Sequence, residues 1–283
     1  MLSLFICLLI SFTASGSSSE VFYRELAIHH SPVVLQGQGH NPVADIFTRI
    51  DFDGDLDADN NWKNVKLAQT AGSFVYYDVI ETNSHWFITY GFFYPRDYAY
   101  PFCFWQICHE NDFEGMKLAV KKDDSAFGKV VLFENQAHGS IYFERNPEVD
   151  GHIKVVIESE GHGLYSTRSK RPETNHISYS YGQYELLPMS DLWEKRDQIG
   201  NGQLWRGTFD YNSESGAILN VPNAFGGKKW GKAAANPPWA WKPVGLYKGD
   251  WFFDPANSIC RTIGCLPGQD SEYIFNPYLS ANL

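Results

Sequence analysis

The segment CHENDFEG contains three potential metal ligands, His109, Asp112 and Glu114. If the chain enters a strand at Asp112, the two carboxylates point to the same face of that strand. The residues that continue this face are apolar and predict a core: Met116, Leu118 and Val120. A buried carboxylate pair is costly unless a cation lies beside it. The pattern therefore predicts either a divalent metal or a Lys or Arg next to the two acids.

The residue types in this segment also indicate which metal would bind. His109 lies in the turn before the strand, where it can fold back over the strand's first residues. Oxygen and imidazole ligands favour Mg, Ca or Mn over a thiolate-rich zinc site. The opposite face of the strand carries Lys117 and Lys121 and is predicted to be solvated. The short spacing alone leaves two alternatives open, a metal site and a charged surface turn.

The N-terminal segment, residues 1–16, predicts where the protein goes. An apolar run from Leu2 to Phe12 is followed by small residues, which is typical of a secretory signal peptide and predicts a secreted, extracellular protein. A buried N-terminal strand is the alternative. The run is too short to cross a bilayer and no other stretch has enough uninterrupted apolar residues, so no transmembrane segment is expected.

Four cysteines follow this segment: Cys103, Cys108, Cys260 and Cys265. Export favours two disulfides, and the local pairings are the first with the second and the third with the fourth. The first disulfide would restrain the turn that leads into His109. Four free thiols in a reducing compartment are the alternative.

The composition limits the partners and predicts the fold class. A net charge of -10 argues against nucleic acid, whose phosphates require clustered Lys and Arg. Between Gly72 and Ser159, six short apolar, β-branched and aromatic runs alternate with turn-rich pieces. They predict a mainly all-β protein, an antiparallel β-sandwich with long loops and a few short helices, forming a single domain over residues 17–283.

Two segments after the strand region differ from it in residue pattern and composition. SDLWEKRDQI, which starts at Ser190, predicts a short helix. From about residue 200 the chain is rich in Trp, Gly and Pro, which predicts an ordered long loop over the sandwich. Its residues Trp230, Trp239 and Trp241 either seal the edge of the core or engage a ligand.

Two further histidines end β-like runs beside glycine, His138 in QAHG and His162 in EGHG. Glycine lets a ligand or another backbone approach closely. Alone, each is a polar residue at a strand end; together, they predict a solvent-accessible pocket beside Asp112. The aspartates of DFDGDLDADNNW, residues 51–62, offer oxygen ligands for Ca, but the position of Gly54 differs from that in an EF-hand and favours a solvated acidic turn.

Three motifs occur in a fixed order between residues 72 and 166: CHENDFEGMKLAV, GKVVLFENQAHGSIYF and HIKVVIESEGHGLY. They resemble the necrosis- and ethylene-inducing-like proteins, whose heptapeptide G-H-R-H-D-W-E is followed by an Ala-His-Gly strand end and a later His strand end. The order is also similar to that of the vacuolar-sorting-like family with an H-x-G-D-W-E motif.

The resemblance implies a divalent cation at one end of a β-sandwich, held by His109, Asp112 and Glu114. His138 and His162 match two histidines near that site, and Asp97 is the nearest counterpart of an additional upstream acid. The family lyses plant membranes after recognising a sphingolipid headgroup. This chain has Asn111 where the family has a second histidine and Phe113 where it has tryptophan, so the fold and the metal carry over better than the toxin activity.

Three functions stay open. The first is a secreted metal-binding protein that recognises a lipid headgroup or glycan at a membrane surface, with cytolysis as the resemblance implies. The second is a metal-dependent hydrolase of a phosphoester with His138, His162 or Glu110 as proton carrier. The third is an extracellular protein with a structural metal. The chain has no Gly-x-Ser-x-Gly elbow and no phosphate-binding glycine loop, so no motif commits it to an enzymatic reaction.

Overall fold

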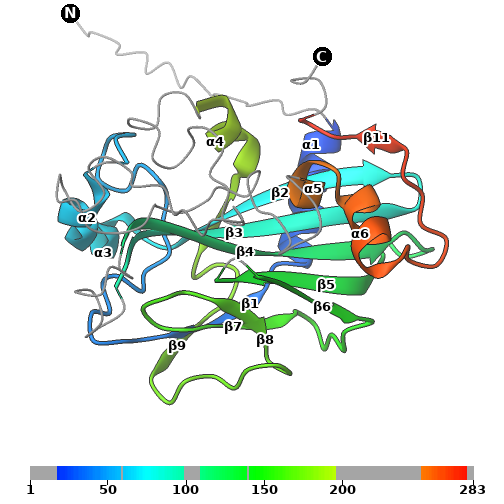
Figure 1. Cartoon of the computed structure of the whole chain (residues 1–283). Coiled ribbons are helices and arrows are strands. Elements are labelled where there is room, and N and C mark those ends of the chain that lie inside the picture. Colours follow the sequence, from blue (N-terminus) through cyan, green and yellow to red (C-terminus); the bar gives the residue numbers. More distant parts are fainter. Residues whose placement is uncertain (1–17, 59, 99–108, 139, 196–249, 279–283) are drawn as a thin grey trace, which may run out of the picture.

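The computed structural model describes residues 18–58, 60–98, 109–138, 140–195 and 250–278. Three predictions lie outside the described residues: the signal peptide, the Cys103–Cys108 disulfide and the tryptophan-rich loop between residues 200 and 249. Two β-sheets packed face to face form most of the molecule (Figure 1). The predicted all-β sandwich with a few short helices is confirmed.

The larger, seven-stranded sheet has the strand order β10-β2-β3-β4-β5-β6, with β11 also paired to β2. Its strands are β2 (Phe74–Thr82), β3 (His85–Asp97), β4 (His109–Lys121), β5 (Lys129–Ala137), β6 (Ser140–Arg145), β10 (Glu185–Pro188) and β11 (Tyr273–Phe275). Strands β2 to β6 form an antiparallel meander, as their runs of apolar and aromatic residues predicted. β10 pairs with β2 in parallel, so the sheet is mixed.

The smaller, four-stranded sheet has the order β8-β7-β1-β9. Its strands are β1 (Val33–Gly37), β7 (Lys154–Ile157), β8 (Leu164–Ser166) and β9 (His176–Tyr179). β1 and β7 are parallel, so both strands end at the same edge of the sheet. The loops that follow them therefore start side by side, and these loops contribute to the candidate site.

The core between the sheets uses one face of each strand. Along β4, Met116, Leu118 and Val120 are fully buried and pack against residues of the smaller sheet such as Val155 and Leu164. The predicted continuation of the Asp112 and Glu114 face into the core is confirmed. Apolar burial of this kind contributes roughly 1.5–3 kcal/mol for each large side chain.

The other face of the larger sheet is also buried, which the sequence did not predict. A second core packs against it from α4 (Met189–Lys195), α5 (Asp250–Phe253) and α6 (Pro255–Ile263) (Figure 1). Lys117, predicted to be solvated, is buried here, where its ammonium group pairs with Glu134. The prediction was correct for Lys121, which is exposed. The helix predicted at Ser190 corresponds to α4.

The remaining helices lie near the N-terminus. They are α1 (Ser18–His29), α2 (Asn61–Asn64), the 3-10 turn η1 (Val65–Leu67) and α3 (Ala68–Ala71). α1 packs Leu26 and Ala27 into the core between the sheets, and the Tyr90 hydroxyl donates a hydrogen bond of 2.7 Å to the Ala27 carbonyl. No described helix is both long and apolar enough to cross a membrane.

Candidate metal and ligand site

The first residues of β4 and the last residues of β3 lie at one end of the sandwich. The strand register pairs Asp97 with His109, Tyr94 with Asp112 and Phe92 with Glu114. Opposite residues of a strand pair lie on the same face and close together. The backbone therefore places Asp97 beside His109, as expected of two ligands of one site, although the side chains of His109 and Glu110 are outside the described set.

Asp112 and Glu114 are both buried, with 4% and 2% of their surface exposed. Their two-residue spacing puts both carboxylates on the face toward the smaller sheet, ahead of the apolar part of β4. Burial and the Asp112 charge raise the pKa of the Glu114 carboxyl well above its usual range, and the charges of Glu158 and Asp97 add to this shift. The acidic residues thus share one environment.

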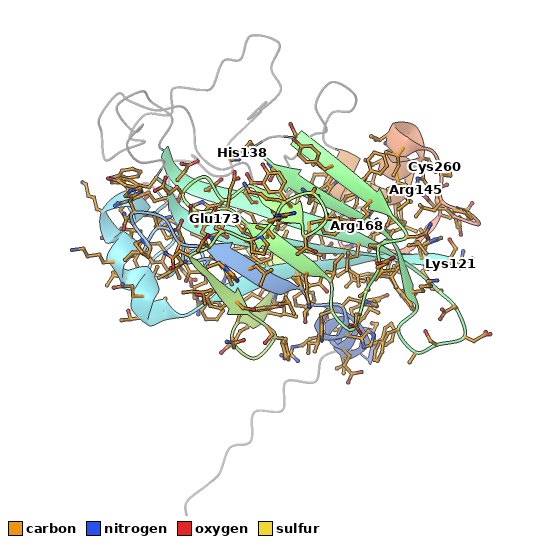
Figure 2. All side chains as sticks on the ribbon, turned by 90° about the horizontal axis from the view of Figure 1, so that it is seen from below. Lys121, His138, Arg145, Arg168, Glu173 and Cys260 are labelled. Carbon is orange, nitrogen blue, oxygen red and sulfur yellow. A yellow bond between two sulfur atoms is a disulfide. The ribbon has the colours of Figure 1, made fainter. Side chains whose placement is uncertain are left out.

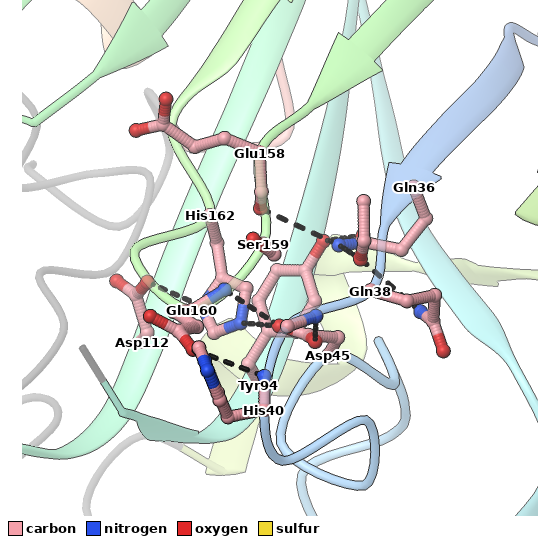
Figure 3. Close-up of polar contacts among 12 residues, drawn as sticks. Gln36, Gln38, His40, Asp45, Tyr94, Asp112, Glu158, Ser159, Glu160 and His162 are labelled. Atoms are coloured by element: carbon pink, nitrogen blue, oxygen red, sulfur yellow. Dashed lines mark hydrogen bonds and ion pairs between the residues drawn. The ribbon is translucent and has the colours of Figure 1, made fainter. Parts of the chain in front are cut away.

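His162 provides the positive charge nearest to Asp112. Its Nδ1 lies 2.9 Å from Asp112 Oδ2, and its Nε2 lies 3.4 Å from Asp45 Oδ1 (Figure 3). The ring stacks on Tyr94, with ring centroids 3.7 Å apart. Although burial lowers the pKa of His162, the hydrogen bonds and charges of the two aspartates raise it to about 10. The imidazolium is therefore held between two buried carboxylates.

This contact corrects one part of the sequence analysis. His162 was predicted to face a solvent-accessible pocket with His138, but its side chain is fully buried. It comes to the Asp112 end of the sandwich, as expected. Its observed contacts are with protein groups, so a direct role in ligand binding stays a prediction.

His138 is the exposed histidine of the site, with 52% of its side chain accessible. Its backbone N–H donates to Glu114 Oε1 at 3.2 Å, and its ring hydrogen-bonds Glu158, which also pairs with Lys170. The hydrogen bond with Glu158 raises the pKa of His138. A β-carbon on Gly163 would lie 2.8 Å from the His138 ring, so the glycine allows the close approach that the EGHG motif predicted.

The donor set fits a hard divalent cation. Carboxylate oxygens are the ligands that Mg and Ca prefer, and a cation between Asp112 and Glu114 would offset the charge repulsion that raises the pKa of Glu114. Across the part of the chain that the structure describes, no three His, Cys, Asp or Glu side chains form a ready metal cluster. The His109 side chain falls outside that part. Metal binding therefore stays a prediction.

Two residues that depart from the family heptapeptide have structural contacts. The Asn111 side chain donates to the Ala58 carbonyl at 2.9 Å and accepts from the Asn61 amide at 2.6 Å, which ties the 51–62 loop to β4. Phe113 packs into the helix-covered core, directly over Gly91. These positions therefore support the strand that carries the acids.

Sequence reasoning missed Asp45 and Glu158. Asp45 is fully buried and accepts hydrogen bonds from the backbone N–H groups of Gly39 at 2.7 Å and Glu160 at 2.6 Å (Figure 3). Both acids lie in loops that follow the parallel strands β1 and β7. No local pattern marks such loop residues. The pairing of those two strands brings Asp45 to His162, whereas Glu158 lies against His138 and Lys170.

The other residues singled out in the sequence lie outside the candidate metal and ligand site. Cys260 and Cys265 form a disulfide, as predicted, at the end of α6. In the acidic turn, Asp51 pairs with Arg49, Asp53 accepts from the Asn64 amide and Asp55 accepts from the Asp57 backbone. These contacts agree with a solvated acidic turn whose carboxylates accept hydrogen bonds from nearby protein groups.

No family model matches the chain, and no curated protein matches it in sequence. Among solved structures, "NLPPya in complex with glucosamine" has 16% identity and a TM-score of 0.44, with 86% of this chain and 90% of that chain covered. "Necrosis and Ethylene inducing Protein 2 from the causal agent of cocoa's Witches Broom disease" has 16% identity and a TM-score of 0.42, with 86% and 91% covered.

The chain thus resembles necrosis- and ethylene-inducing proteins, as its motifs predicted. The resemblance to the vacuolar-sorting-like family stays a prediction.

Proposed function

We propose that the chain is a secreted protein that binds a sugar-bearing headgroup at a membrane surface, using a divalent cation held by Asp112 and Glu114 together with Asp97 and His109. Damage to that membrane is part of the proposal and rests on the resemblance stated from the sequence. The observation that carries it is the pair of buried carboxylates at one end of the sandwich, next to the exposed His138.

The residues of the site have separate roles in this proposal. Asp112 and Glu114 hold the cation, Mg, Ca or Mn, which when bound would supply open coordination positions for sugar hydroxyls. His162 fixes the orientation of Asp112 through its 2.9 Å contact. His138 and Glu158 offer a hydrogen-bond donor and acceptor at the surface next to these acids.

The test compares wild type with Glu114→Gln, which keeps the shape of the side chain and the oxygen that accepts the His138 N–H. Asp123→Asn, an exposed carboxylate change in the β4–β5 turn, is the matched control. We expect wild type and the control to contain one divalent cation by elemental analysis, and Glu114→Gln to bind Mg, Ca and Mn at least tenfold more weakly by calorimetry. A metal-free native protein that no added cation stabilises would contradict the proposal.

The headgroup is tested separately with glucosamine, the sugar named for one of the similar structures. Calorimetry with this sugar and dye release from vesicles are measured with added cation and with a chelator. Vesicles of phosphatidylcholine with and without a glycosylated sphingolipid are compared. We expect binding and release only with the cation, and release only from the glycosylated vesicles.

The exposed His138, paired with the partly buried Glu158, favours a second candidate, a phosphoester hydrolase in which His138 carries the proton. A chromogenic phosphodiester distinguishes the two functions. Cation-dependent turnover that is lost in His138→Gln would favour the hydrolase, whereas sugar binding without turnover favours the headgroup-binding protein.

A further inference from the structure

A hollow of 560 Å³ lies on the side of the sandwich where β6, the last strand of the larger sheet, meets β8, the last strand of the smaller sheet. Residues from both sheet edges line it, among them Phe133, Asn135, Tyr142, Glu144, Ser166 and Arg168. Its volume falls within the roughly 300–1,000 Å³ of small-molecule sites. Figure 2 labels Arg145 and Arg168, which both line the hollow.

An aromatic surface forms part of this hollow. Tyr142 is 49% exposed although it lies in a strand. The Tyr165 ring lies beside Tyr142, with ring centroids 6.1 Å apart, and the Lys170 ammonium lies 4.7 Å from the Tyr165 centroid. An exposed tyrosine that a neighbouring ring holds in place offers a flat apolar face with a polar tip, which suits the C–H face and the hydroxyls of a sugar ring.

The polar groups of the hollow are arranged for hydroxyl recognition. Arg168 Nη1 donates to Glu144 Oε1 at 2.8 Å, and the Arg168 side chain is still 64% exposed. An ion pair between the two sheets thus presents donors and acceptors side by side, with the Ser166 hydroxyl next to them. A smaller hollow of 130 Å³ adjoins the first, because Glu144, Ser166 and Arg168 line both. The groove is therefore elongated.

The groove leads toward the candidate metal site. Asn135, at its floor, precedes His138 by three residues along β5, which corresponds to roughly 10 Å of strand. Lys170 also links the groove to the candidate metal site. Its ammonium pairs with Glu158 at the metal site and lies over the Tyr165 ring beside the groove. A ligand bound at His138 that extends along this side of the molecule would enter the groove.

We propose that the groove between β6 and β8 is a second sugar subsite, so that the chain recognises an oligosaccharide rather than one sugar. Tyr142 provides the stacking surface, and Arg168 and Glu144 bind the hydroxyls. This inference rests on the proposed function for the class of ligand, a glycan. The residues proposed to bind the second sugar lie on β6, on β8 and in the turn after β8. They are separate from the acids of β4 that form the candidate metal site.

The experiment measures the affinity of the full chain for glucosamine and for its linear β-linked trimer by calorimetry, with and without Ca. We expect the trimer to bind about tenfold more tightly than the single sugar. Tyr142→Ala and Arg168→Ala should each remove this advantage. Tyr181→Ala, which changes an exposed tyrosine just after β9 at the opposite edge of the smaller sheet, should keep it.

Each outcome separates this inference from the proposed function. Trimer binding that depends on Tyr142 and survives Glu114→Gln supports the groove even if the metal site binds no sugar. A trimer that binds no better than the single sugar in wild type overturns the groove and leaves the metal site standing. Tyr142-dependent binding of a nine-residue polythreonine peptide with no trimer binding would show instead that the β6 edge takes up a peptide strand, and would also overturn it.

Discussion

At the scale of single residues, His138 and His162 share a backbone conformation and differ in environment. Their φ angles are 50° and 52°, in the left-handed region that costs a non-glycine residue about 1–3 kcal/mol. Each conformation is held by a carboxylate, Glu158 for His138 and Asp112 for His162. One ring is half exposed and the other is buried, so substitutions at the two positions should have unlike effects.

We predict that His162→Gln lowers the free energy of unfolding by about 3–5 kcal/mol, because it leaves Asp112 and Asp45 buried without their cation. His138→Gln is the matched control. The His138 ring is half exposed, so its ion pair with Glu158 should contribute no more than about 1 kcal/mol. Urea unfolding at pH 7, followed by tryptophan fluorescence, measures both. Equal small losses would show that the buried pairing does not stabilise the fold.

Asp78 on β2 gives a prediction about pH. Burial raises its pKa from 3.8 to about 7, and hydrogen bonds from Tyr278 and from the Val79 backbone only partly oppose this. The folded state thus holds the proton more tightly than the unfolded state does. The stability from this group is fully present below about pH 3.8 and is lost as the pH rises through about 7.

Wild type should therefore lose up to about 4 kcal/mol between pH 4 and pH 8 through this group. Asp78→Asn cannot ionise, so its stability relative to wild type should increase over the same range. Urea unfolding at one-unit pH steps measures the difference between the two proteins. Parallel pH profiles would mean that Asp78 keeps an ordinary pKa in the folded state.

At the scale of elements, one buried ion pair joins three of them. Lys117 Nζ on β4 lies 2.6 Å from Glu134 Oε2 on β5 and donates to the Trp251 carbonyl of α5 at 3.1 Å. The ammonium also lies 4.5 Å from the centroid of the Trp251 ring. The pair thus fixes α5 against the face of the larger sheet, inside the helix-covered core.

Lys117→Met should cost about 3–5 kcal/mol, because Glu134 is then buried without its partner. The double variant Lys117→Met/Glu134→Leu should recover most of this loss, since it removes both charges. Chemical denaturation of the two variants and wild type provides the comparison. A double variant as unstable as the single one would indicate that packing around Lys117, rather than its charge, is what matters.

Strands β2 to β6 of the larger sheet were predictable because their apolar and aromatic runs are local. The burial of Lys117 was not. A lysine at alternate positions of a strand usually indicates a solvent-exposed face. The partner Glu134 lies opposite Lys117 because the β4–β5 register shifts between Ala119 and Val120, and no turn or pattern in the sequence specifies that shift. The helices that cover this face come more than 60 residues later in the chain.

In the candidate site too, the local features were predictable and the long-range contacts were not. The two-residue spacing placed Asp112 and Glu114 on one strand face, and the glycines beside His138 and His162 indicated a close approach. The burial of His162 depends on Asp45, and that contact needs the parallel pairing of β1 with β7. Parallel neighbours are joined by long connections, so their pairing leaves no hairpin signal in the sequence.

At the scale of the whole molecule, both hydrophobic cores share the larger sheet. The smaller sheet packs on one face of it and the helices α4, α5 and α6 on the other. Removing either outer layer would expose a face of strands such as β3 and β4, which are buried on both sides. The two cores should therefore unfold together, as a single domain.

Leu164→Ala on β8 and Leu192→Ala on α4 test this, since each truncates a buried leucine in a different outer layer. Each should cost about 2–5 kcal/mol, and both should shift one common transition measured by near-ultraviolet circular dichroism and by tryptophan fluorescence. Ile274→Ala, at a position 57% exposed, is the control. Its free energy of unfolding should stay within about 0.5 kcal/mol of the wild-type value. Two separate transitions, with each variant moving only one of them, would show that the helical layer unfolds independently of the sandwich. In that case the larger sheet would keep its structure with one face in water, which the apolar residues on both of its faces make unfavourable.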